Sequence, residues 1–253
     1  MNEKEVAIKA AKEAGKLLVE KFGDIHHIKD KGLKEDVTNV DMEAEKIILS
    51  EIKKHFPDHN ILSEESGEEN KSSEYTWIID PIDGTTNYSV RNPFFNTSIG
   101  LAKNNEIILG VIYAPIINEL FVAEKGKGAF LNDKKISVSD EQSLSKCLIT
   151  FCHGKTDEDL KKISEIFGKL KKAAKDFDRM KSGALELAFV AAGRFGGFIY
   201  NNVRPWDVAA GILLVKESGG KVTDFEGNEW DLTKKNLVAT NGKIHEELLK
   251  NIK

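Results

Sequence analysis

Cysteine is scarce in this sequence, with Cys147 and Cys152 the only two among 253 residues. Their spacing lacks the paired C-x-x-C pattern of a zinc site, and two cysteines are too few for a disulfide framework. His26 and His27 lie in a polar stretch with no third ligand nearby, so they do not complete a zinc site either. We therefore expect two inert, partly buried thiols, because free cysteine usually behaves as a small hydrophobic residue.

Long apolar runs and an excess of positive charge are also absent. No stretch approaches the roughly 20 apolar residues that a membrane-spanning helix needs. The first residues, MNEKEVAIKAAKEAGKLL, contain acidic side chains and lack the apolar centre of an export signal. Lys and Arg number 37 against 41 Asp and Glu, and the net charge of −4 argues against a nucleic-acid platform. We expect a cytoplasmic protein that binds neither membranes nor nucleic acids.

The composition is otherwise that of a folded soluble protein, with 40% apolar and 31% charged residues. Helical spacing of apolar residues predicts helices over 3–22 and about 39–56, and Pro57 stops the second helix. A short strand is expected within 60–66. A core strand is expected to end at 77–79. Strand-like segments separated by turn signals then predict an antiparallel meander over 96–103, 106–115, 119–126 and 128–132.

The second half of the chain has a different order of predicted elements. Strand-like and helical segments alternate irregularly there, at 146–151, 157–172, 183–193, 195–200, 206–220 and 236–241, and a last helix follows. The length is ample for a large core. We expect a layered α+β protein with two sheet-containing halves, 1–145 and 146–253, that meet at a cleft within one compact unit.

The string WIIDPIDGTTNY at 77–88 places two carboxylates directly after an apolar strand. Pro81 stiffens the turn between Asp80 and Asp83. Two carboxylates held close together repel each other unless a cation lies between them. Mg²⁺ prefers oxygen ligands and often binds through one or two carboxylates plus substrate phosphate. The motif therefore predicts a Mg²⁺ site, with two ordinary turn aspartates as the alternative.

Further groups are candidate ligands for the same ion. The backbone carbonyl of Ile82 lies between the two aspartates, and Glu64 or Glu65 follows the preceding predicted strand. Asp207 begins a predicted helix in the string RPWDVAAG. Because Asp is also a common helix cap, a purely structural role for Asp207 stays open.

The residues that follow Asp83 predict where a phosphate would bind. Gly84 offers an unhindered backbone N–H, and a helix that starts near Thr85 would add the positive end of its dipole. The Thr85 hydroxyl, paired with a carboxylate, could polarise a water whose pKa a metal has already lowered. Asp41 is the candidate partner, with an exposed acid on a helix face as the alternative.

Four strings together resemble the inositol monophosphatase family of Mg²⁺-dependent, lithium-sensitive sugar and inositol phosphatases. They are DVTNVDMEAE at 36–45, ILSEES at 61–66, WIIDPIDGTTNY at 77–88 and PWDVAAGILLVKESGG at 205–220. The similarity covers nearly the whole chain, and the string DPIDGT is highly specific. The resemblance implies a layered α/β/α/β/α sandwich of the sugar-phosphatase type with a metal cleft, a phosphomonoesterase activity and a homodimer.

The resemblance also implies two to three Mg²⁺ ions and the residues that would hold them. A first ion would bind Glu64, Asp80 and the Ile82 carbonyl. A second would bind Asp80, Asp83 and Asp207, and Glu64 with waters would hold a weaker third.

Catalytic roles follow from the same resemblance. Thr85 with Asp41 would activate the attacking water, with Glu64 as a further catalytic group through the third ion. The backbone amides of Gly84 and Thr85 would hold the phosphate. Lys31 lies near a loop lysine of the family.

Two positions depart from the family pattern on the substrate-facing side. Many relatives have a glutamate seven residues before the helix-starting Asp, where it binds inositol hydroxyls, and here Tyr200 stands at that position. A glycine of the family is replaced by Lys181. Nearby cations could bind a second phosphate, with an ordinary surface charge as the alternative for each, and they are Arg179, Lys181, Arg194 and Arg204.

The substrate therefore stays open among inositol 1-phosphate, fructose 1,6-bisphosphate and, more distantly, adenosine 3′,5′-bisphosphate. The residues expected to contact it are Gly84, Thr85, Asp83, Tyr200, Asp207, Arg179 and Arg204. A function of a different class is a regulator that binds RNA polymerase or another protein through the same fold, a role for which some members of the family are known.

Overall fold

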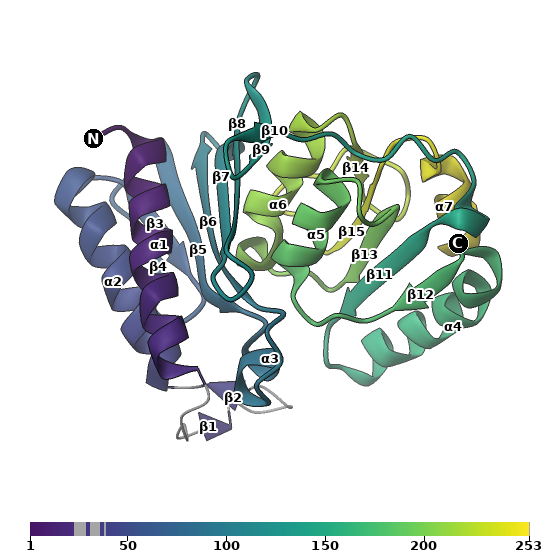
Figure 1. Cartoon of the computed structure of the whole chain (residues 1–253), viewed down its shortest axis with the longest axis horizontal. Helices are drawn as coiled ribbons and strands as arrows, with labels where there is room; N and C mark the ends of the chain where they lie inside the picture. The colour runs from purple at the N-terminus through teal and green to yellow at the C-terminus, as the bar shows by residue number, and fades with distance from the viewer. Residues whose placement is uncertain (23–28, 31–35, 38, 253) are drawn as a thin grey trace.

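The computed structural model describes residues 1–22, 29–30, 36–37 and 39–252. Two helices that lie side by side form its first layer, α1 (Glu3–Lys21) and α2 (Asn39–His55) (Figure 1). Asn2 caps α1, because its side chain accepts a hydrogen bond from the Glu5 backbone N–H at 2.9 Å. Both predicted N-terminal helices are confirmed. Two short strands pair between them, β1 (Lys29–Asp30) and β2 (Asp36–Val37).

The first sheet has eight strands in the described chain, in the order β10-β9-β8-β7-β6-β5-β3-β4. Their bounds are β3 (Asn60–Ser63), β4 (Gly67–Glu69), β5 (Tyr75–Asp83), β6 (Asn96–Lys103), β7 (Glu106–Ala114), β8 (Glu119–Glu124), β9 (Gly128–Leu131) and β10 (Lys134–Lys135). The strands from β6 to β9 form the predicted antiparallel meander, which β5 and β10 extend on either side, and β3 runs parallel to β5. The C-terminal ends of β3 and β5 therefore meet at one edge of the sheet.

The prediction that the strand ends before Asp80 is wrong. Strand β5 continues to Asp83, and its register against β6 shifts between Asp80 and Asp83, as in a β-bulge. Pro81 is tolerated there, and its carbonyl accepts a hydrogen bond from Thr97 Oγ1 at 2.9 Å. A bulge re-aims the side chains around it, which is a common device next to active sites.

The second sheet has five strands in the described chain, in the order β12-β11-β13-β15-β14. Their bounds are β11 (Leu148–His153), β12 (Asp176–Asp178), β13 (Gly197–Asn201), β14 (Lys221–Thr223) and β15 (Asn236–Thr240). The remaining helices are α3 (Thr85–Ser89), the 3₁₀ turn η1 (Leu144–Lys146), α4 (Asp157–Ala173), α5 (Gly183–Ala191), α6 (Pro205–Glu217) and α7 (His245–Ile252). The sequence patterns did not predict the three-residue edge strands β12 and β14.

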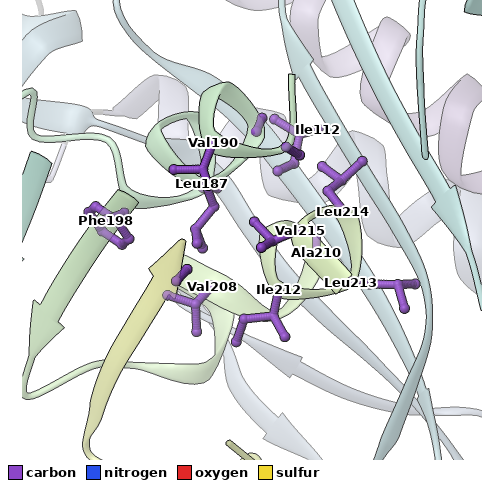
Figure 2. Packing of buried hydrophobic residues seen from close by; sticks show 14 of the residues in the cluster. Ile112, Leu187, Val190, Phe198, Val208, Ala210, Ile212, Leu213, Leu214 and Val215 are labelled. Atoms are coloured by element: carbon purple, nitrogen blue, oxygen red, sulfur yellow. The ribbon is translucent and has the colours of Figure 1, made fainter. Parts of the chain in front are cut away.

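Helices and sheets alternate in layers. Helices α1 and α2 cover the outer face of the first sheet, α5 and α6 lie between the two sheets, and α4 and α7 cover the outer face of the second (Figure 1). Buried side chains of α5 and α6, such as Leu187 and Val215, form the central core (Figure 2). The predicted α+β fold, a layered α/β/α/β/α sandwich, is confirmed.

Helix α6 packs closely against the first sheet because two glycines of that sheet leave room for it. A Cβ atom at Gly110 would lie 2.5 Å from the Ala210 carbonyl oxygen, and one at Gly100 would lie 3.2 Å from Ala209 Cβ. Only glycine avoids the first of these contacts. The close packing brings Asp207, in the first turn of α6, to the ends of β3 and β5.

Candidate functional site

A cleft opens where the ends of β3 and β5 meet the second sheet and the start of α6. Its inner cavity, of about 140 Å³, is lined by Glu64, Asp80, Ile82, Asp83, Gly84, Thr85, Thr86, Cys152, His153, Lys155, Arg179, Lys181, Gly183, Tyr200 and Asp207. A wider hollow of about 580 Å³ continues it and is lined in part by the same side chains. Of the predicted metal and substrate residues, all but Arg204 line the inner cavity, and Arg204 lines the wider hollow.

Asp80 is the least satisfied carboxylate of the cleft. It is 2% exposed, and its Oδ1 atom has no hydrogen-bond partner among the described residues. Burial raises the pKa of Asp80 well above its ordinary value, and the carboxylates of Glu64, Asp83 and Asp207 raise this pKa further. The alternative of an ordinary turn aspartate does not explain that oxygen, because turn aspartates bond to nearby backbone amides. The surroundings favour a bound cation or a proton.

Asp83 is held by hydrogen bonds from the other half of the chain. Its Oδ2 atom accepts from Ser182 Oγ at 2.8 Å and from the Ala184 N–H at 2.9 Å, and its Oδ1 atom accepts from the Gly183 N–H at 3.0 Å. Asn96 Nδ2 adds a bond of 2.6 Å to Oδ2. Burial raises the pKa of Asp83, and the bonds from Ser182 and Asn96 oppose this rise. Asp83 therefore caps α5 as well as lining the cleft, and Oδ1 is the less occupied oxygen.

Glu64 follows β3 directly and is tied to β5, because its N–H donates to the Ile79 carbonyl at 3.1 Å. The buried Glu45 on α2 holds the same segment from behind. Its Oε1 atom accepts hydrogen bonds from Ser63 Oγ and, at 3.1 Å, from both the N–H and the Oγ of Ser66. Sequence reasoning missed Glu45, although it lies one helical turn after Asp41 and shares its face of α2.

The Thr85 hydroxyl lies between two acceptors. Its Oγ1 atom is 2.9 Å from the Ile82 carbonyl oxygen and 3.3 Å from Asp41 Oδ2. Asp41 is 1% exposed, so its interpretation as an exposed acid on a helix face is wrong. Gly84 precedes Thr85 with φ of +95°, and a Cβ atom there would lie 3.1 Å from the Phe94 carbonyl oxygen. Glycine is therefore required at this turn for conformation and for space.

Asp207 lies three residues after Arg204, the N-cap of α6, and the Arg204 backbone is a hydrogen-bond partner of its carboxylate. Its Oδ2 atom also accepts a hydrogen bond of 2.7 Å from the hydroxyl of Tyr200, on β13. Desolvation by the surrounding protein raises the pKa of Asp207 well above its ordinary value, and Glu64 raises it further. Desolvation, followed by the charge of Asp207, also raises the pKa of Tyr200, so this phenol keeps its proton.

The carboxylates fit a hard divalent cation by their chemistry. Among the described residues, no three His, Cys, Asp or Glu side chains form a closed metal cluster. Mg²⁺ does not need such a cluster, because it keeps several waters and takes oxygens from substrate phosphate. The cleft offers carboxylate oxygens from Glu64, Asp80, Asp83 and Asp207, and the unpartnered Oδ1 of Asp80 is among them.

The predicted cations divide into two groups. Arg179 and Lys181 line the inner cavity, and Arg204 lines the wider hollow. Arg194 does not join them, and the alternative of a surface charge holds for it. Its guanidinium forms two bonds of 2.7 and 2.5 Å with the carboxylate of Glu119 on β8, away from the cleft-lining residues.

Sequence reasoning missed Lys155 and His153, which line both the cavity and the hollow. The turn that carries them is fixed by Asp159, whose carboxylate accepts from Thr156 Oγ1 at 2.8 Å and from Asn202 Nδ2 at 3.0 Å. A weak signal was available, because these residues follow a predicted strand and strand ends often carry binding groups.

Other sequence predictions concern residues away from the chemistry. Cys147 and Cys152 are free and buried, and burial raises the pKa of both thiols. No helix within the described residues is long and apolar enough to cross a membrane. His26, His27 and Lys31 lie outside the described residues.

Comparison with known proteins gives consistent results. A family model described as "Inositol monophosphatase family" matches residues 2–253. The chain is 39% identical to a fructose-1,6-bisphosphatase/inositol-1-monophosphatase of Thermotoga maritima, over 99% of this chain and 95% of the relative. It is 40% identical to the Nus factor SuhB of Escherichia coli K12, over 98% and 94%. The crystal structure of the extragenic suppressor protein suhB from Bartonella henselae matches with a TM-score of 0.94 and 40% identity, over 98% of this chain and 97% of that one.

Proposed function

Because the chain belongs to the inositol monophosphatase family, we propose that it is a Mg²⁺-dependent phosphomonoesterase that hydrolyses inositol 1-phosphate and related sugar phosphates. The observation that carries the proposal is the buried Asp80 Oδ1 without a hydrogen-bond partner in a cleft lined by four carboxylates. Such a cleft favours a cation, and a cation there would attract a phosphate. Two to three Mg²⁺ ions per site are proposed.

Each carboxylate has a proposed ligand role. Glu64, Asp80 and the Ile82 carbonyl would hold one ion, and Asp80, Asp83 and Asp207 would hold another. Glu64 would also hold the weaker third. When bound, Mg²⁺ supplies positive charge to the phosphate and lowers the pKa of coordinated water. The hydrogen bonds to Asp83 and Asp207 keep these two ligands oriented before an ion arrives.

Thr85 and Asp41 are the proposed groups for activating the attacking water. The Thr85 hydroxyl has one proton, which it donates to either the Ile82 carbonyl or Asp41. Its lone pair is then free to accept a hydrogen bond from a water in the cleft. Asp41, within 3.3 Å, is the base that would receive the proton through Thr85. Glu64 is proposed as a further catalytic group, acting through the third ion.

The phosphate is proposed to bind the backbone amides of Gly84 and Thr85, with the rest of the substrate toward Arg179 and Arg204. A second substrate, fructose 1,6-bisphosphate, is supported by the cations Lys155, Arg179, Lys181 and Arg204, which line the cleft and its adjoining hollow. A relative 39% identical also carries both activities in its name. Separate cationic contacts suit a substrate with two phosphates.

A regulatory role is the second candidate function, since relatives 40% identical are named Nus factor SuhB. The predicted metal ligands Glu64, Asp80, Asp83 and Asp207 all line the cleft, so we propose the regulatory role beside catalysis and not in place of it. We further propose a cytoplasmic homodimer, in which 1–145 and 146–253 are halves of one compact unit.

Phosphate release from a panel of substrates, measured with Mg²⁺ and with EDTA, tests the proposal. We expect Mg²⁺-dependent release from inositol 1-phosphate and from fructose 1,6-bisphosphate. The Asp80→Asn variant is the matched negative control, because it keeps the side-chain shape and removes the charge. No Mg²⁺-dependent release from any phosphate ester in the panel would overturn the enzymatic proposal in favour of the regulatory one.

A further inference from the structure

Tyr200 occupies the position where a residue that contacts the substrate was expected. In the structure its hydroxyl is already used, because it donates a hydrogen bond of 2.7 Å to Asp207 Oδ2. A hydroxyl has a single proton, so Tyr200 cannot also donate to a substrate hydroxyl while this bond exists. Its remaining capacity toward a ligand is that of a weak acceptor.

The ring of Tyr200 is held firmly enough to position another group. It lies on β13, which pairs with β11 on one side and β15 on the other. Its ring meets Phe198 edge-on with centroids 6.0 Å apart. A Cβ atom on Gly183 would be 3.4 Å from Tyr200 Cε1, so the first residue of α5 is in van der Waals range of the ring. The hydroxyl therefore stands at the end of a packed, two-torsion side chain.

Fewer hydrogen bonds orient Asp207 than orient Asp83. Asp83 is oriented by Asn96, Ser182 and the first amides of α5. Asp207 lies in the first turn of α6, where the Arg204 backbone is one hydrogen-bond partner of its carboxylate and Tyr200 is the side chain that donates to it. Without the hydroxyl, the Asp207 carboxylate would be freer to rotate about its terminal torsion.

We propose that Tyr200 is a positioning residue for the metal ligand Asp207 and not a reader of substrate hydroxyls. Its hydroxyl fixes Oδ2 and leaves Oδ1 for the cation. The inference rests on the proposed function only in that the cation is Mg²⁺ bound by Asp207. Groups that orient a metal ligand in this way typically change metal affinity by about 10–100-fold when they are removed.

The test is Mg²⁺ binding to the metal-free protein, measured by titration calorimetry without substrate. The variant is Tyr200→Phe, which keeps the ring and removes the hydroxyl. The matched control is Tyr113→Phe, which removes the phenol that contacts Asn118 on an exposed turn away from the cleft. We expect Tyr200→Phe to weaken Mg²⁺ binding at one site by about 10-fold or more, and Tyr113→Phe to leave it unchanged.

Kinetics provide a second readout. For Tyr200→Phe we expect the Mg²⁺ concentration at half-maximal rate to rise, with kcat recovering at saturating Mg²⁺ and substrate KM unchanged. Unchanged Mg²⁺ affinity, or a raised KM at every Mg²⁺ concentration, would overturn the inference and return Tyr200 to the substrate.

The two proposals fail in different ways. Weaker Mg²⁺ binding by Tyr200→Phe, in a protein that hydrolyses no phosphate ester, would support the positioning role and overturn the phosphatase proposal. A wild-type protein that hydrolyses substrate and binds Mg²⁺ as the variant does would overturn the positioning role alone. Absence of Mg²⁺ binding in the wild type would overturn both.

Discussion

Two aspartates of this protein, Asp80 and Asp224, are almost equally inaccessible to solvent and yet have opposite electrostatic properties. Asp80 is 2% exposed and Asp224 is 6% exposed. The pKa of Asp80 lies well above the ordinary value, whereas the pKa of Asp224 is lowered to about 2. Asp80 lies within β5 and Asp224 directly follows β14.

The partners of the two carboxylates account for this difference in pKa. Burial acts to raise the pKa of Asp224, but hydrogen bonds from Lys234 and Asn228 outweigh it. Lys234 Nζ lies 2.8 Å from Asp224 Oδ2, and the Asn228 N–H donates to Oδ1 at 2.8 Å. Asp80 has other carboxylates around it and an oxygen with no partner in the described chain. A structural aspartate is neutralised by the chain itself, whereas the cleft leaves that charge for a ligand.

The largest expected effect is a loss of activity on substitution of Asp80, which substitution of Asp224 should not cause. We expect Asp80→Asn to lower kcat/KM with Mg²⁺ by about 10³–10⁴-fold, because it removes a charged hard ligand worth several kcal/mol in the transition state. Asp207→Asn should do the same. The control is Asp224→Asn, whose activity should stay within about two-fold of the wild type. Near-normal turnover in Asp80→Asn would contradict the metal assignment.

The next effect tests whether Thr85 acts on the rate or on binding. We expect Thr85→Ala to lower kcat by about 10²-fold, because a positioned hydroxyl is lost from proton transfer. Substrate KM should change little, since the backbone amides that would hold the phosphate remain. Steady-state kinetics at saturating Mg²⁺ measure both constants. An effect confined to KM would leave Thr85 with a binding role only, and Glu64 would become the candidate for activation.

The third prediction concerns stability, which we expect to depend on Asp224 and not on Asp80. Asp224→Asn should lower the free energy of unfolding by about 1–2 kcal/mol, since hydrogen bonds to a charged group are lost. That corresponds to a decrease in Tm of about 2–8 °C for a chain of this length. Asp80→Asn should leave the Tm of the metal-free protein unchanged or raise it, because an amide is neutral among the surrounding carboxylates without having to bind a proton. Thermal unfolding in EDTA measures both, and a large loss of stability in Asp80→Asn would contradict the comparison.

The smallest effect is in the pH dependence of stability. The folded metal-free protein retains protons on Asp80 and Asp207 at pH values where the unfolded chain has lost them, so the contribution of these two groups to stability is lost as the pH rises above about 4. Asp224 has the opposite sign: its contribution is present above about pH 4 and is lost as the pH falls toward 2.

Mg²⁺ competes with those protons, so it should raise the Tm more at about pH 8 than at about pH 5. Thermal unfolding with and without Mg²⁺ at the two pH values measures this difference, which Asp80→Asn should reduce and Asp224→Asn should preserve. An equal stabilisation at both pH values would mean that protons and Mg²⁺ do not share the cleft.

The contrast also separates what local patterns could predict from what they could not. The predicted helices and the meander are confirmed, because apolar periodicity and turn residues act over a few neighbouring residues. Asp80 and Asp83 were recognisable as candidate metal ligands because they lie only three positions apart in the sequence. The strand was predicted to end too early, since a bulge depends on the register against β6 and not on β5 alone. Lys155 had only its place after a strand to mark it, and Arg194 was assigned to the cleft only because it lies near other cations in sequence.

The sequence by itself determined the inventory of the cleft: the acidic groups, the glycine that the turn requires and the threonine beside it. Only the tertiary structure decided which of these groups are already engaged. Asp83 is hydrogen-bonded to residues about a hundred positions away in the sequence, and Tyr200 on strand β13 is hydrogen-bonded to Asp207 on helix α6. Asp80 Oδ1 has no such partner in the described chain. The physical reason is that a hydrogen bond is directional and short, so its partners depend on how the two sheets and the helices between them are packed.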